Sequence, residues 1–245
     1  MDNALYVGLS RQMTLRRELD IVANNIANAN TTGFKVEDLM VHTEQAKPAK
    51  TLDGSSPVKF VLDTGVARDF TQGAMTKTGG DFDLAIEGKA FFKIQTASGE
   101  RYTRDGRFTT NPEGVLVTQA GNPVMDEGGG QILIDPKLGP VTIGKDGIVS
   151  QGAIRAGKIG VVRPDDMASL AKDGDNLYRN TANTTLQPVT DAQVHQGMLE
   201  SSNVQPVIEI TKLIEIQRAY EGVAKMMDNT AELSRSAVER LGKLN

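Results

Sequence analysis

Apolar residues at both ends of the chain recur in alternating steps of four and three, the spacing of a coiled-coil helix seam. The N-terminal pattern runs from Met1 to Ala29, with Gly8 and Gln12 as weak members, and the C-terminal pattern runs from Leu213 to Leu241. The sequence therefore predicts two long terminal helices. The residues expected to pack at their seams are Leu15, Leu19, Val22, Ile26, Leu213, Ile216, Tyr220, Val223 and Met227.

The C-terminal seam is flanked by apolar residues at positions that usually carry charges in a two-stranded coiled coil. These residues are Ala219, Ala224, Met226, Ala231, Leu233 and Val238. So wide an apolar face predicts neighbours on at least two sides, and hence terminal helices that become fully ordered only when copies of the chain assemble. The alternative left open is a helical hairpin that packs along the chain's own β body.

Between the ends, the apolar period changes from helical to two, as in Phe82, Leu84 and Ile86 or Ile132 and Ile134. Frequent Gly, Pro, Asn and Asp turn signals separate these short runs. The pattern predicts an antiparallel all-β domain over residues 81–195. Residues 36–80 are expected to form an extended connector or hairpin, with strand candidates at Val58–Leu62 and Val66–Phe70.

The predicted fold class is α+β, with a coiled-coil base formed by the terminal helices and a central antiparallel all-β domain. Residues 1–35 are assigned to the N-terminal helix, 196–205 to a return connector and 206–245 to the C-terminal helix. Pro206 suits the first helical turn, and Ser201, Ser202 and Asn203 offer capping side chains before it.

Composition argues against several functions. The net charge of −4 gives no indication of nucleic-acid binding, and the absence of cysteine removes disulfides and thiolate chemistry. His42 and His195 do not have metal-ligand spacing. Catalytic residues, metals, cofactors and small-molecule substrates are therefore not expected, and the carboxylate pairs Asp81 with Asp83 and Asp165 with Asp166 are interpreted as solvated loop residues.

No targeting segment is visible in the sequence. The first twenty residues carry charges throughout, so they do not resemble a secretory signal, and no apolar run approaches the ~20 residues of a membrane span. Classical signals alone predict a cytoplasmic protein without membrane insertion.

The stretch "NNIANANTTGFK" places several asparagines at the end of the first helix, where they weaken the helix and favour turns. Asn30 with Gly33 makes a plausible helix stop, but Asn24 and Asn25 lie a full turn earlier. Because amides both donate and accept hydrogen bonds, Asn24, Asn25 and Asn28 are predicted to fix the register between assembled copies.

Several long motifs resemble those of the bacterial flagellar axial proteins, the rod and hook proteins. In chain order they are DIVANNIANANTTGFK, TQGAMTKTGGDFDLAIEGKAFFKI, RYTRDGRFTTNPEGVLVTQAGNPV and QGMLESSNVQPVIEITKLIEIQRAYEGVAKMMD. The resemblance covers nearly the whole chain. The modest length of the chain and its first residues, "MDNALYVGLSRQM", favour a proximal-rod member of this family. A distal rod or hook protein is the alternative.

The resemblance implies a structural, torque-transmitting subunit of the basal-body rod, in which the terminal helices form a helical array around a central channel. Its partners would be copies of itself, other proximal and distal rod proteins, and the flagellar type III export apparatus. Export without a cleaved signal would place it in the periplasm and suits a cysteine-free chain. The rival hypotheses are a peptidoglycan-acting enzyme and an adhesin or phage-tail-like fibre.

Overall fold

The structure is a computed structural model that describes residues 2–45, 59–182, 186–189 and 192–242. The chain divides into two units. The helical unit consists of Met1–Ala27, Glu37–Arg68 and Gln205–Asn245, and the sheet unit consists of Asn28–Val36 and Asp69–Val204. The terminal helices and the antiparallel sheets between them confirm the predicted α+β class.

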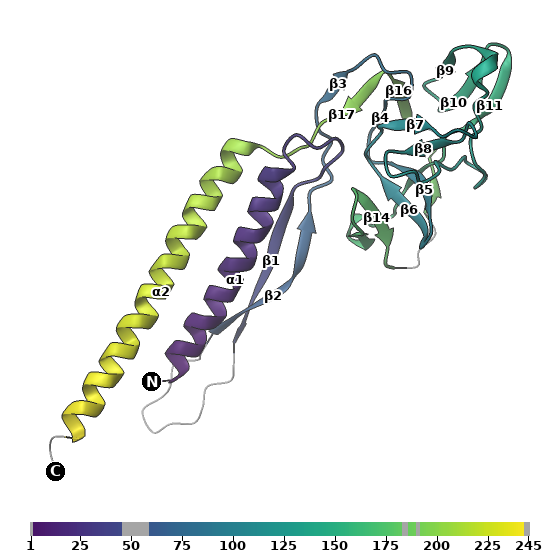
Figure 1. The fold of residues 1–245 in the computed structure, drawn as a ribbon. Coiled ribbons are helices and arrows are strands. Elements are labelled where there is room, and N and C mark those ends of the chain that lie inside the picture. Colours follow the sequence, from purple (N-terminus) through teal and green to yellow (C-terminus); the bar gives the residue numbers. More distant parts are fainter. Residues whose placement is uncertain (1, 46–58, 183–185, 190–191, 243–245) are drawn as a thin grey trace. The chain divides into compact units, whose positions relative to one another are not determined.

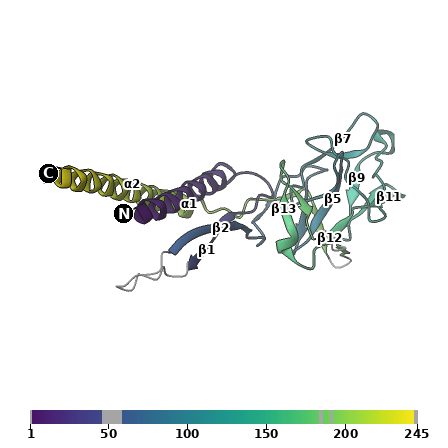
Figure 2. The ribbon, with the colours of Figure 1, turned by 90° about the horizontal axis from the view of Figure 1, so that it is seen from below.

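The helical unit contains helices α1 (Asp2–Ala27) and α2 (Pro206–Gly242) and a hairpin of strands β1 (Glu37–Gln45) and β2 (Lys59–Arg68). The two helices run antiparallel, and α1 lies between α2 and the hairpin (Figures 1 and 2). As predicted, Pro206 is the first residue of α2. Over their described residues, neither helix is both long and apolar enough to cross a membrane.

The β1–β2 hairpin differs from the two short strands expected near residues 58–70. Strand β2 is a single run that pairs antiparallel with β1, from Glu37 opposite Arg68 to Gln45 opposite Lys59. The register shifts between Met40 and Val41. Pairing along this length satisfies the backbone groups of each strand that point toward the other strand. Val58, where one expected strand began, lies outside the described residues.

The sheet unit is built from short strands and two single-turn 3-10 helices, and all of its described strand pairs are antiparallel. The strands are β3 (Met75–Lys77), β4 (Leu84–Glu87), β5 (Phe91–Thr96), β6 (Gly99–Thr103), β7 (Phe108–Thr110), β8 (Leu116–Thr118), β9 (Val141–Ile143), β10 (Ile148–Gln151), β11 (Ile154–Lys158), β12 (Val161–Arg163), β13 (Leu170–Lys172), β14 (Leu177–Asn180), β15 (Gln187–Pro188), β16 (Gln193–Gln196) and β17 (Met198–Glu200). The largest sheet has the order β13-β14-β6-β5-β12-β15.

The apolar alternation seen in the sequence marks the core of the sheet unit. Ile132 and Ile134 are buried, whereas Leu133 between them is 59% exposed. Strand β4 departs from this pattern, because Ala85 is as fully buried as its neighbours Leu84 and Ile86. A strand enclosed on both faces buries consecutive residues, so its period of two does not separate inside from outside.

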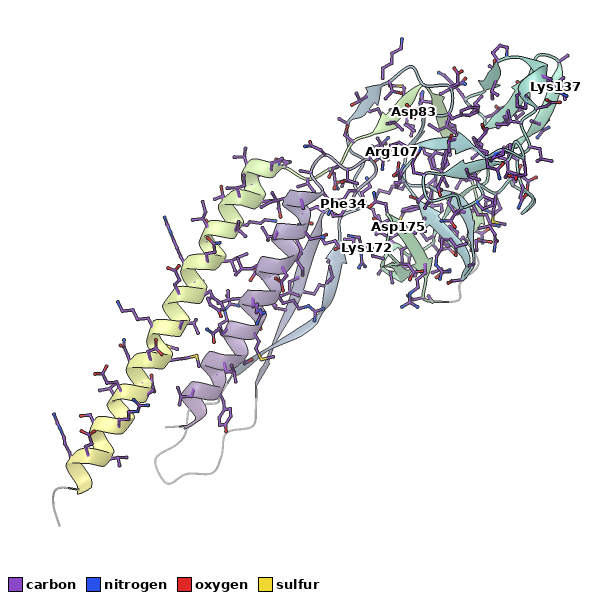
Figure 3. The ribbon with its side chains drawn as sticks, in the orientation of Figure 1. Phe34, Asp83, Arg107, Lys137, Lys172 and Asp175 are labelled. Carbon is purple, nitrogen blue, oxygen red and sulfur yellow. The ribbon has the colours of Figure 1, made fainter. Side chains whose placement is uncertain are left out.

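Residues 28–36 belong to the sheet unit rather than to the first helix, which ends at Ala27. Gly33 donates its backbone N–H to the carbonyl oxygen of Glu200 and has a φ of 69°. A Cβ at this position would lie 2.5 Å from the carbonyl carbon of Arg104, so only glycine fits. The next residue, Phe34, is buried, and the Lys172 ammonium lies 4.4 Å from its ring centroid (Figure 3).

Lys35 continues this segment into a buried ionic cluster. Its Nζ lies 2.6 Å from Oε1 of Glu200, and Nη1 of Arg104 lies 3.2 Å from the other oxygen of the same carboxylate. All three side chains are at most 1% exposed. Burial lowers the pKa of Lys35 and that of Arg104, and the Glu200 carboxylate opposes both shifts. One carboxylate therefore holds two buried cations in the sheet unit.

We expect Glu200→Gln to destabilise the sheet unit by about 3–5 kcal/mol, because it leaves two buried cations without their counter-charge. Urea unfolding followed by tyrosine fluorescence measures this loss, since Tyr102 and Tyr178 are buried in the same unit. Glu87→Gln is the control: it removes the more exposed His195–Glu87 pair and should cost less than about 1 kcal/mol. Equal unfolding midpoints for the two variants would contradict the assigned role of the cluster.

Candidate assembly surface

The predicted seam residues of the two terminal helices meet between α1 and α2 of the same chain. Leu15, Val22 and Ile216 are buried there. The partly buried residues that pack against them are Leu19, Ile26, Leu213, Tyr220 and Val223. The seam thus aligns the two helices of one chain, and any contribution to contacts between chains is an additional role.

Met227 occupies the end of the seam near the start of α1. A Cβ built on Gly8 would lie 2.9 Å from Cγ of Met227, closer than real side chains approach. Gly8 contributes little apolar surface to the seam, but its lack of a side chain lets the two helices come close together.

Asn25 lies on another face of α1, is completely buried, and uses both ends of its amide. Its nitrogen donates to the carbonyl oxygen of Glu37 at 2.8 Å and to Oε2 of Glu209 at 2.9 Å. Its oxygen accepts the backbone N–H of Glu37 at 3.0 Å. Asn25 therefore joins α1 to the first residue of β1 and to the first turn of α2. These contacts fix register inside one chain.

Charged residues surround this buried amide. The Nζ atom of Lys212 forms ion pairs with Oε1 of Glu209 at 2.9 Å and with Oδ1 of Asp38 at 3.1 Å. Burial lowers the pKa of Lys212, but its hydrogen bonds to Glu209 and Asp38 outweigh this effect, and the net shift is upward. Arg68 pairs with the Glu37 side chain at 2.7 Å. The ends of the hairpin and of α2 are thus held by a continuous polar network.

The other two asparagines of the predicted register set lie elsewhere. Asn24 is exposed on α1. Asn28 belongs to the sheet unit, where its side chain accepts from the Thr31 hydroxyl at 3.1 Å and its carbonyl accepts from the Thr31 N–H at 3.0 Å. The structure therefore does not bring Asn24, Asn25 and Asn28 into one site. Their predicted role between copies stays a hypothesis.

Large apolar side chains remain exposed on both helices. On α1 they are Tyr6, Leu9 and Met13, and on α2 they are Val207, Ile208, Ile210, Ile214, Met226, Leu233 and Val238. The last three belong to the wide apolar face predicted for the C-terminal helix. The others were not predicted, although the i, i+3, i+7 spacing of Tyr6, Leu9 and Met13 indicates a shared helix face. The helical unit therefore presents an extensive apolar surface.

Several of the carboxylates and one of the histidines examined as candidate catalytic or metal-binding groups form hydrogen bonds or ion pairs that stabilise the fold. The Asp83 carboxylate accepts from the Thr78 hydroxyl, and Asp166 caps the short 3-10 helix Met167–Ser169. His195 pairs with Glu87 at 2.9 Å, while the His42 side chain lies outside the described residues. Within the described part of the chain, no group of three or more His, Cys, Asp or Glu side chains could hold a metal ion.

Three protein-family profiles match the chain. They are "Flagella basal body rod protein" at residues 5–35, "Flagellar hook protein FlgE/F/G D1 domain" at residues 85–151 and "Flagellar basal body rod FlgEFG protein C-terminal" at residues 195–240. The first and last of these matches include most of α1 and α2, which carry the exposed apolar surface.

Individual relatives match along their full length. The flagellar basal-body rod protein FlgF of Caulobacter vibrioides is 86% identical over 245 residues, the whole of both chains. FlgF of Mesorhizobium japonicum is 40% identical over 99% of each chain. The rod protein FlgG of Bacillus subtilis is 33% identical over 97% of this chain and 98% of its own.

The chain therefore belongs to the family of flagellar rod and hook proteins, which confirms the resemblance carried by its motifs. Its full-length similarity to FlgF identifies it, within that family, as a structural protein of the basal-body rod and not an enzyme.

We expect Asn25→Ala to destabilise the helical unit, because the substitution removes the hydrogen bonds of the Asn25 amide to the Glu37 backbone and to the Glu209 carboxylate. Each buried group left unpaired costs about 1–3 kcal/mol. Urea unfolding monitored by circular dichroism at the helical band measures the loss. Asp20→Ala, at an exposed position of α1, should change stability by less than about 0.5 kcal/mol. An Asn25→Ala protein as stable as this control would refute the proposed importance of the amide.

Proposed function

We propose that this chain assembles helically through its terminal helices, as a proximal-rod subunit of the torque-transmitting shaft around a central export channel. The single observation that carries the proposal is the apolar surface left exposed on α1 and α2. Met13 is 67% exposed, Val207 78% and Leu233 69%. A soluble chain rarely leaves so much apolar side-chain surface uncovered unless a partner covers it.

The dimensions of α2 support this proposal. The helix has 37 residues and so extends about 55 Å. Helix α1 covers one face of α2, at the seam centred on Ile216. Covering an exposed Val, Leu or Ile side chain stabilises by about 1.5–3 kcal/mol. Neighbouring copies that covered the remaining faces would make the coiled-coil base of an assembled rod.

The proposed interface includes the seam residues together with Asn24, Asn25 and Asn28. In this proposal the seam residues and Asn25 act by holding α1 and α2 in the alignment that presents the outer apolar residues. Asn24 is exposed on α1, and in this proposal a neighbouring copy contacts it. The proposed interface between copies is compatible with the packing of α1 on the β1–β2 hairpin of the same chain, because that packing leaves the outer faces of both helices uncovered.

The proposed location is the basal body in the periplasm, reached through the flagellar type III apparatus without a cleaved signal. Partners are copies of the same chain and the other proximal and distal rod proteins. Support comes from the rod-protein names of the full-length relatives. The absence of cysteine fits a chain that crosses an export channel unfolded.

We expect Ile216→Asp to abolish swimming, because a charge in the seam separates α1 from α2 and misplaces the outer apolar residues. Hydrogen exchange of residues 84–200 in the full chain should stay unchanged, since these residues belong to the sheet unit. Gln217→Asp introduces the same charge at the adjacent exposed position and should leave motility intact. Normal swimming of the Ile216→Asp strain would count against the proposal.

Limited proteolysis of the purified monomer should first remove residues from α1 and α2 and leave a resistant core of about 69–204, because helices with uncovered apolar faces open more readily than a buried sheet core. The same chain in isolated basal bodies should resist cleavage at its ends. Termini equally resistant in the monomer and in the rod would favour a self-sufficient helical hairpin.

A further inference from the structure

We propose that two apolar triads of the helical unit dock onto each other between neighbouring copies. Triad A consists of Tyr6, Leu9 and Met13 on α1, and triad B consists of Val207, Ile210 and Ile214 on α2. The inference rests on the proposed helical assembly and names the surfaces that one copy offers to the next.

The two triads have the same geometry. Each occupies positions i, i+3 and i+7 of its helix, so its three side chains form one stripe. All six side chains are exposed, from 44% for Ile214 to 78% for Val207. At 3.6 residues per turn, each stripe is turned roughly 130–150° away from the seam of its own helix. Each triad therefore faces away from the other helix of its own chain.

The triads lie at different levels along the helical unit. Gly8, beside Leu9, is level with Met227, whereas Glu209, beside Ile210, is level with Asn25. Triad A is therefore level with the middle of α2, and triad B is close to the end of α1. Measured along α1, their centres are separated by about fifteen residues, or roughly 22 Å. A single chain cannot bring its own two triads together.

Charges beyond the triads select how two copies would align. A parallel alignment, Tyr6 on Val207 and Met13 on Ile214, would place Asp20 opposite Glu221. Both carboxylates are exposed, and like charges facing each other are unfavourable. An antiparallel alignment, Tyr6 on Ile214, Leu9 on Ile210 and Met13 on Val207, separates these charges. Charge therefore selects the antiparallel pairing.

Antiparallel pairing is also what a polar stack of identical copies requires. Because α1 and α2 run antiparallel within one chain, copies that all point the same way present α1 antiparallel to a neighbour's α2. Docking triad A on triad B then shifts each copy along the helix axis by roughly 22 Å relative to its neighbour. Such a contact is heterologous and leaves a free triad at each end, so it propagates instead of closing.

The size of the contact fits a polymer better than a dimer. Three side chains a side cover much less than the ~1,200–2,000 Å² of a stable two-protein interface. A single A–B contact is therefore weak in solution, and it persists when each copy makes it at both ends in a rod. The occupant of each triad is thus a second copy of this chain.

Cysteine cross-linking tests the pairing directly, because the chain contains no cysteine. Leu9→Cys and Ile210→Cys are placed in two differently tagged copies, which are co-expressed, and isolated basal bodies are oxidised. A disulfide forms only when the Cα atoms lie within about 7 Å. We expect a dimer that carries both tags, at a yield roughly tenfold or more above that from Asp20→Cys with Ile210→Cys. A chain with both Leu9→Cys and Ile210→Cys should give a ladder of multimers.

The other outcomes overturn the inference. Same-tag dimers as the main product would mean that each triad pairs with its own kind, and cross-links only to a different rod protein would replace the second copy as occupant. No cross-link in rods that contain both variants would refute the pairing while leaving the proposed rod function intact. If either variant is not incorporated, Met13→Cys with Val207→Cys, opposed in the same register, decides in its place.

Discussion

The buried amide of Asn25 is the contact that sets the geometry of the helical unit. Its oxygen and nitrogen satisfy the backbone of Glu37 in the way a neighbouring strand would, and the nitrogen also binds the Glu209 carboxylate. A shift of α1 along either partner would leave these groups buried and unpaired, at a cost that an apolar contact would not impose. The amide therefore determines which apolar residues of α1 face inward and which stay exposed.

A second buried cluster has the same role in the sheet unit. The stretch that follows Asn25 leaves the helix at Ala27 and reaches Gly33, which only glycine can occupy against the Arg104 backbone. Lys35 then enters a site where Glu200 holds two cations without access to water. The start of the asparagine-rich stretch is thus held in the helical unit by Asn25, and its end is held in the sheet unit by Lys35. This explains its mixture of helix-ending, turn-forming and charged residues.

Incomplete burial is the property that connects this fold to its family. The sheet unit encloses a large apolar core, whereas the seam of the helical unit buries only a few apolar side chains among its described residues. The polar contacts of Asn25, Glu209 and Lys212 align the helices without covering them. Helices that are aligned but uncovered suit a structural protein of the rod, because their surface is available only for association with other chains.

The sequence alone determined what depends on local order: the two terminal helices, the start of α2 at Pro206, the buried alternation around Ile132 and Ile134, and the family. Only the tertiary structure decided which faces are covered, where α1 gives way to the sheet unit, and what the asparagines bind. Asn25 and Glu209 are 184 positions apart, and Lys35 and Glu200 are 165 apart. Periodicity shows which residues share a face of an element, but a partner so distant along the chain is fixed only when the whole chain has folded.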